Sequence, residues 1–107
     1  MIIYISAPYA NGDNGDIEDN IKKVIDCADE LCELGHVPFI PHLAHLWHLL
    51  SPKPASFWLW YDLVWLNYCD ALLRLPGKSQ GADKEVKFAE EHCIPVYYSI
   101  REFAYVN

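Results

Sequence analysis

Short apolar runs alternate with amphipathic stretches along this chain. Residues 2–6 are rich in β-branched side chains and stop before Pro8, which predicts a first strand. Residues 17–34 carry apolar side chains at three- and four-residue steps, with Asp16 as a helix N-cap and Gly35 as a C-terminal glycine. We therefore expect a strand followed by an amphipathic helix that packs on a sheet.

The same alternation continues along the rest of the sequence. Residues 36–41 contain two prolines and predict a short or edge strand. Residues 70–75 form a mostly apolar run that is typical of a central parallel strand, and residues 94–98 predict the last strand. A helix rich in aromatic residues, with Ser56 as its expected N-cap, precedes the central strand, and another helix follows it to about residue 92.

Strands that alternate with helices predict a parallel sheet with right-handed crossover connections. We expect a three-layer, flavodoxin-like α/β fold, with four to five parallel strands and helices on both faces of the sheet. Residues 1–107 contain no internal repeat and no low-complexity run, which favours a single domain.

Composition and charge exclude several function classes. Of the 107 residues 52% are apolar and 14% aromatic, which indicates a globular protein rather than a disordered tail. The formal charge of −7 argues against a nucleic-acid polymer as partner, because phosphate contacts need clustered Lys and Arg. No apolar run reaches the roughly 20 residues that span a bilayer, and Met1 leads directly into a strand. We expect a cytoplasmic protein with no membrane partner.

The aromatic helix, residues 57–68, is apolar nearly all round. Such a helix is buried on more than one side, either in the core of a monomer or at a subunit interface. A chain this short has few other elements to cover so much aromatic surface, so we favour a homo-oligomer, a dimer or higher. The chain would also be small for an enzyme with a closed pocket, and a second subunit could complete such a site.

Three histidines, His42, His45 and His48, are spaced at i, i+3 and i+6. A pair at i, i+3 on a helix can share a zinc ion, but no H-E-x-x-H motif and no nearby cysteine pair accompany it. The third histidine is also turned by about 120° from the first on a helix. We expect hydrogen-bonded histidines that line or cap a cleft, and no metal.

The four cysteines lie in helical patterns without a C-x-x-C pair, and we expect reduced thiols at all of them: Cys27, Cys32, Cys69 and Cys93.

The candidate chemistry lies around the central strand. This strand leads into the loop of residues 76–81, and ligands bind at the carboxyl ends of strands in open α/β sheets. We expect Glu85 in the first turn of the next helix, at the edge of a cleft, and Asp62 on the preceding helix can point toward the same end. Among aromatic side chains Asp62 would have a raised pKa and could act as a general acid, or it could lie exposed on the polar stripe of its helix.

Two sequence patterns resemble a known family. The spacing Asp62…Trp65-Leu66…Asp70, followed by Ser79-x-Gly81-x-x-x-Glu85, resembles the core motif of the nucleoside 2-deoxyribosyltransferase superfamily, including its 2′-deoxynucleoside 5′-monophosphate N-glycosidase branch. Residues 2–9 are similar to the first strand and loop of that family. The two patterns cover both ends of a small domain, which makes them more specific together than either is alone.

The resemblance implies cleavage or transfer at the N-glycosidic bond of a nucleoside or nucleoside 5′-monophosphate. It implies that Glu85 is the nucleophile of a covalent glycosyl-enzyme intermediate, that Asp62 handles the nucleobase or the acceptor, and that Tyr4 orients Glu85. No cofactor and no metal are required. The implied partner is a small-molecule nucleoside or nucleotide.

The expected substrate-binding residues follow the first strand, follow the central strand, or belong to the histidine cluster. They are Ser6, Ala7, Pro8, Tyr9, Gly77, Lys78, Ser79, Gly81 and His42. In the monophosphate-hydrolysing branch the matching serine contacts the phosphate, so Ser79 with Lys78 favours a nucleotide substrate. We interpret Asp70 as structural.

Three features depart from the family pattern: Ala7, the length of the chain, and Asp83 with Lys84 in place of the small or aromatic residues of some relatives. Ala7 stands where relatives often have Gly, and the chain is shorter than well-known transferases, which favours hydrolysis over base exchange. Asp83 would raise the pKa of Glu85 if close, while Lys84 would oppose it.

An alternative function is a non-catalytic protein that binds or senses a nucleotide derivative and needs no reactive Glu85.

Overall fold

The computed structural model describes residues 1–9 and 16–103 and has a four-stranded parallel sheet. The strand order is β2-β1-β3-β4, and every neighbouring pair is parallel. The strands are β1 (Ile2–Ser6), β2 (Val37–Phe39), β3 (Ala71–Arg74) and β4 (Val96–Tyr97). The predicted strands are confirmed, with β2 short and at an edge, although β2 and β4 are shorter than the apolar runs that predicted them.

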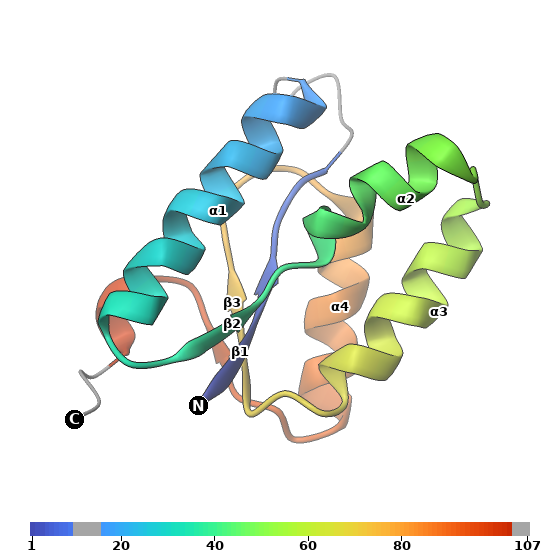
Figure 1. The fold of residues 1–107 in the computed structure, drawn as a ribbon. Coiled ribbons are helices and arrows are strands. Elements are labelled where there is room, and N and C mark those ends of the chain that lie inside the picture. The colour runs from blue at the N-terminus through green and yellow to red at the C-terminus, as the bar shows by residue number, and fades with distance from the viewer. Residues whose placement is uncertain (10–15, 104–107) are drawn as a thin grey trace.

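Helices cover both faces of the sheet, as expected. Helix α1 lies on one side, and α3 and α4 lie on the other, with α2 beside α3 near the carboxyl ends of the strands (Figure 1). The helical elements are α1 (Ile17–Glu33), η2 (Pro41–Ala44), α2 (His45–Leu50), α3 (Ala55–Leu66), α4 (Gln80–Glu91) and η3 (Ile100–Glu102).

The alternation of side chains along β1 builds two separate cores. Ile3 and Ile5 are fully buried against α1, whereas Tyr4 packs with Leu66 and Leu72 on the opposite face. Because side chains alternate along a strand, Ser6 emerges on the same face as Tyr4. The polar side chain of Ser6, on an otherwise apolar strand, is thereby directed toward α4.

Two sequence expectations about helix starts were wrong. Helix α3 begins at Ala55 with Pro54 as its N-cap, because the Pro54 carbonyl already accepts from the Phe57 N–H at 3.0 Å, and Ser56 lies inside the first turn. Helix α4 begins at Gln80, so Glu85 lies in its second turn rather than its first. The expected ligand-facing loop after β1, residues 9–15, lies outside the described residues except for Tyr9.

None of the helices in residues 1–9 and 16–103 has the length and apolar character needed to cross a membrane. The four cysteines, all within this part of the chain, form no disulfide.

The N-cap of α1 provides a test of the local fold. Asp16 Oδ1 accepts from the Asp19 N–H at 2.8 Å, which satisfies one of the free donors of the helix start. We expect Asp16→Ala to lower the free energy of unfolding by about 1 kcal/mol. Asp26→Ala, at an exposed position inside the same helix, should leave it unchanged or slightly higher in urea titrations. Equal effects of the two substitutions would contradict the capping role.

Candidate functional site

A cleft of about 870 Å³ lies at the carboxyl ends of β1 and β3. Ala7 follows β1 at its wall, and the loop after β3 contributes residues 78 and 79. Helices α3 and α4 contribute Asp62 and Glu85 to the same wall. The two carboxylates therefore face one cavity, although they are distant in sequence.

Glu85 is buried, and both of its carboxylate oxygens accept hydrogen bonds from β1. Tyr4 donates its hydroxyl hydrogen to Oε2, and Ser6 donates to Oε1 at 2.7 Å. The exposed fraction of Glu85 is 8%, so the carboxylate is largely cut off from bulk water. Two donors on a rigid strand thus fix the side chain in one orientation.

Opposing effects act on the pKa of Glu85. Burial raises it, because a charged carboxylate loses hydration. The hydrogen bonds from Tyr4 and Ser6 and the positive charge of Arg74 lower it, but the net direction is upward. The pKa of Tyr4 is raised well above its ordinary value by burial first and by Glu85 second, so Tyr4 remains a donor.

Asp62 is half-buried and close enough to Glu85 to be influenced by its charge. Burial first, and repulsion from Glu85 second, raise the pKa of Asp62 to about 8. Within the described residues no hydrogen-bond partner reaches its Oδ1 atom. Asp62 therefore retains its proton at neutral pH. This agrees with the expectation of a carboxyl with a raised pKa among aromatic side chains, and it excludes the alternative that Asp62 lies exposed on a polar stripe of its helix.

The histidine cluster forms another wall of the cleft. His42 Nε2 donates to the Pro8 carbonyl oxygen at 2.8 Å, and burial lowers the pKa of His42, which keeps the ring neutral. Tyr9 contacts His45 through a hydrogen bond, and His48 accepts from the indole N–H of Trp58 at 2.8 Å. The three rings thus have separate partners. Among residues 1–9 and 16–103 no group of three or more His, Cys, Asp or Glu side chains is arranged to hold a metal ion.

Six of the nine expected substrate-binding residues line the cleft: Ala7, Tyr9, His42, Lys78, Ser79 and Gly81. Ser6, Pro8 and Gly77 do not line it. Each has a different contact instead: Ser6 holds Glu85, the Pro8 carbonyl holds His42, and the Gly77 carbonyl accepts from Arg74. The Asp70 carboxylate accepts from the Ile2 N–H at 2.7 Å, far along the strand from the cleft.

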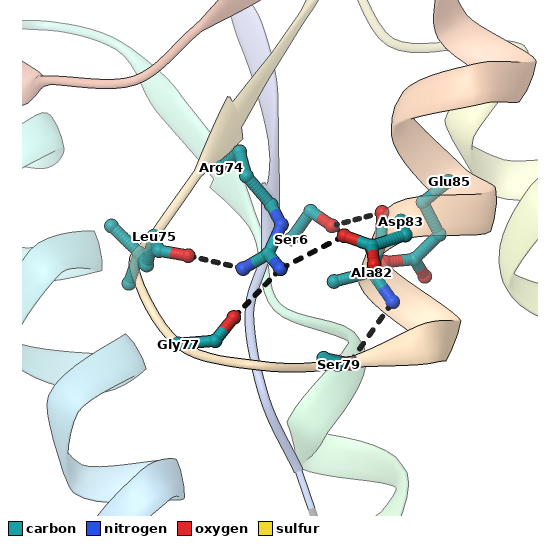
Figure 2. Close-up of polar contacts among 8 residues, drawn as sticks. All are labelled: Ser6, Arg74, Leu75, Gly77, Ser79, Ala82, Asp83 and Glu85. Carbon is teal, nitrogen blue, oxygen red and sulfur yellow. Dashed lines mark hydrogen bonds and ion pairs between the residues drawn. The ribbon is translucent and has the colours of Figure 1, made fainter. Parts of the chain in front are cut away.

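Sequence reasoning missed Arg74. Its guanidinium lies between the end of β3 and the first turn of α4, where it pairs with Asp83 at 3.2 Å (Figure 2). The available signal was an arginine inside the apolar run of a central strand, since a buried charge needs partners. The Asp83 carboxylate, which was expected to raise the pKa of Glu85 if close, is therefore paired with Arg74.

Residues 1–99 match the model of a family described as a domain of unknown function, DUF7768. The chain belongs to this family. Among curated proteins none matches the sequence.

Among solved structures, the fold is similar to that of a 2-deoxyribosyltransferase from the psychrotolerant bacterium Bacillus psychrosaccharolyticus. The TM-score is 0.64 at 22% sequence identity, and the match covers 90% of this DUF7768 chain and 69% of the other. At this identity the similarity shows a shared fold, which is the fold that the sequence resemblance implied.

The raised pKa of Asp62 predicts how stability depends on pH. Folded Asp62 keeps its proton up to about pH 8, whereas the unfolded carboxyl loses it near its ordinary pKa of 3.8. The folded state therefore binds more protons between these values, and stability falls as pH rises through this window. We expect Asp62→Asn to remove this loss, so that its stability relative to wild type rises by roughly 1–3 kcal/mol from pH 5 to pH 8.

Urea unfolding at the two pH values measures this difference. Asp26→Asn, at an exposed position of α1, is the control and should follow wild type. A stability difference for Asp62→Asn that is the same at pH 5 and pH 8 would show that Asp62 is ionised throughout.

Proposed function

We propose that this protein cleaves the N-glycosidic bond of a nucleoside or nucleoside 5′-monophosphate through a covalent glycosyl-Glu85 intermediate. The observation that carries the proposal is the Glu85 carboxylate, buried at the cleft and hydrogen-bonded through both oxygens, with the protonated Asp62 facing the same cavity. A nucleophilic carboxylate and a second carboxyl that can donate a proton are the pair that retaining glycoside cleavage uses. The sequence resemblance and the shared fold point the same way.

The proposed reaction has two steps. A Glu85 oxygen attacks C1′ of the sugar, the C1′–N bond breaks with its electron pair going to the base, and the Asp62 proton neutralises the departing base. A water molecule then attacks C1′, its proton passes to the Asp62 carboxylate, and Glu85 leaves as a carboxylate. Tyr4 and Ser6 hold Glu85 in place through both steps.

The part of the cleft at the start of α4 suits the 5′ end of the substrate. Lys78, Ser79 and Gly81 line it at the start of α4, and Ser79 Oγ accepts from the Ala82 N–H at 3.1 Å, which leaves its own hydrogen free to donate. A volume of about 870 Å³ lies within the range of small-molecule sites. We propose hydrolysis of a nucleotide ahead of base exchange, because Lys78 favours an anion here.

We also propose that the protein is a homodimer in the cytoplasm, with α2 and α3 at the interface. Aromatic contacts between Trp47 and Tyr61 join these two helices, yet much of their apolar surface faces water. Leu46 is 64% exposed, Trp60 60% and Leu50 78%. Burial of so large an apolar surface favours association, and a second copy would also cover the nearby cleft.

The proposed reaction predicts that Glu85→Ala abolishes release of free base. Wild-type protein is incubated with a panel of deoxynucleosides and their 5′-monophosphates, with and without a second free base, and the products are separated by chromatography. We expect roughly a 10³-fold or greater loss in Glu85→Ala, because the nucleophile is gone. Glu91→Ala, at an exposed position of the same helix, is the matched control and should retain full activity.

The panel also separates the alternatives. Unchanged turnover by Glu85→Ala at an unchanged melting temperature would remove Glu85 from the reaction. Tight binding of a nucleotide without any base release by wild type would favour the binding or sensing function. Formation of a new nucleoside with the added base would identify a transferase instead of a hydrolase.

The proposed dimer predicts the mass in solution. Light scattering after size exclusion should give about twice the 12.3 kDa of the chain. Trp60→Glu should shift the protein toward monomer, because a charge at the interface loses its hydration. Tyr98→Glu changes a residue that is slightly more exposed, at 64% against 60% for Trp60, but lies outside α2 and α3, so it should leave the mass unchanged. A wild-type protein that is monomeric at every concentration would contradict the proposal.

A further inference from the structure

The carboxyl end of β3 carries a buried arginine whose neighbours belong to the candidate site. Arg74 is 9% exposed and lies beside Ser6 in the register between β1 and β3. Side chains alternate along a strand, so Arg74 is on the same face as Leu72, the face that α4 covers. Because burying a charge is costly, the arrangement must provide partners for the guanidinium.

These partners come from three successive segments. Arg74 donates through Nη1 to the Leu75 carbonyl oxygen, and through Nη2 to the Gly77 carbonyl oxygen at 2.8 Å and to Asp83 Oδ1 at 3.2 Å (Figure 2). Gly77 has a φ of 123°, in the region that favours glycine, so its carbonyl is turned by a tight loop. The guanidinium thus joins the end of β3, the loop after it and the first turn of α4.

The same guanidinium influences Glu85 from the sheet side. Asp83 precedes Glu85 by two residues on α4. In the same first turn of α4, the Ala82 carbonyl oxygen lies 3.4 Å from Ser6 Oγ. The positive charge of Arg74 lowers the pKa of Glu85, against the upward effect of burial. Asp83 is largely exposed, with 73% of its side chain accessible, so water screens its negative charge more than that of a buried group.

The titratable and charged groups around Glu85 come from every element packed against it: Tyr4 of β1, Asp62 of α3, Arg74 of β3 and Asp83 of its own helix, with His42 and Lys78 on the same cleft. Arg74 is the buried permanent cation of this set.

We propose that Arg74 is a positioning residue for Glu85, which locks the first turn of α4 to the end of β3 and places a permanent positive charge beside the buried carboxylate. This proposal depends on the proposed function only for the part of its test that measures catalysis. Two roles are combined in one side chain, a geometric one through its hydrogen bonds and an electrostatic one through its charge.

Two variants separate these roles. R74Q keeps hydrogen-bond donors but loses the charge, and R74K keeps the charge but loses the planar fork. The acidic limb of kcat/KM against pH reports the ionisation of the free enzyme's nucleophile. Without the cation Glu85 ionises at higher pH, so we expect this limb to move upward by about one pH unit in R74Q. In R74K the limb should stay at the wild-type pH while kcat falls several-fold because α4 is held less firmly.

D83N is the control, because it removes only the exposed partner and leaves the charge of Arg74 intact. Its acidic limb should stay in place or move slightly to lower pH, opposite to R74Q. A limb that is identical in wild type and R74Q, or that moves upward in R74K or D83N, would overturn the electrostatic role. If R74Q does not fold, R74K and D83N still decide, since an upward shift in either contradicts it.

A measurement without turnover keeps this proposal separate from the proposed function. The Glu85 carboxyl is followed by ¹³C NMR as pH is varied in wild type and R74Q. A higher pKa in R74Q supports the role of Arg74 even if wild type releases no base from any substrate, an outcome that would defeat only the proposed function. The same Glu85 titration in both proteins would overturn the role of Arg74 whatever the activity.

Discussion

The structure of the site depends on one buried carboxylate. Glu85 is removed from water, which costs free energy unless its charge is compensated. Tyr4 and Ser6 supply a hydrogen bond to each oxygen, and Arg74 supplies a positive charge from the adjacent strand. Since strands β1 and β3 are hydrogen-bonded in fixed register, these groups are brought together by the sheet itself. Asp62, in contrast, has no such compensation and retains its proton. Burial raises the pKa of both carboxyl groups in the cleft, but only for Glu85 do hydrogen bonds and a cation act in the opposite direction.

Much of the fold was predictable because its signals are local. The β-branched run of residues 2–6, the cap at Asp16 and the glycine at position 35 each act within a few residues, and the structure confirms the strand, the N-cap and the positive φ that these predict. Helix starts were less predictable where two candidate caps lie close together. Pro54 is the N-cap of α3, two residues before Ser56, because a carbonyl is enough to start the helix and proline has no N–H to leave unpaired.

The candidate site was predictable only in part, because its contacts join residues that are far apart in sequence. Tyr4 and Ser6 lie 81 and 79 positions from Glu85, and composition or periodicity contains no trace of these pairs. The resemblance to a known family drew attention to Tyr4 and Glu85, but it treated Ser6 as a substrate ligand and passed over Arg74. The part of the cleft wall that His42 contributes likewise depends on a contact across 34 residues, with the Pro8 carbonyl.

The location of the groups that hold Glu85 has a consequence for how such a domain can diversify. Its supports are strand residues, whereas Tyr9, Lys78 and Ser79 line the cleft from loops and helix ends. Loops accept insertions and substitutions far more readily than paired strands do. Ligand preference could therefore change among members of the family while the anchored carboxylate keeps its position. New specificities are best sought by varying the residues that line the cleft from loops and helix ends and by leaving the strand residues unchanged.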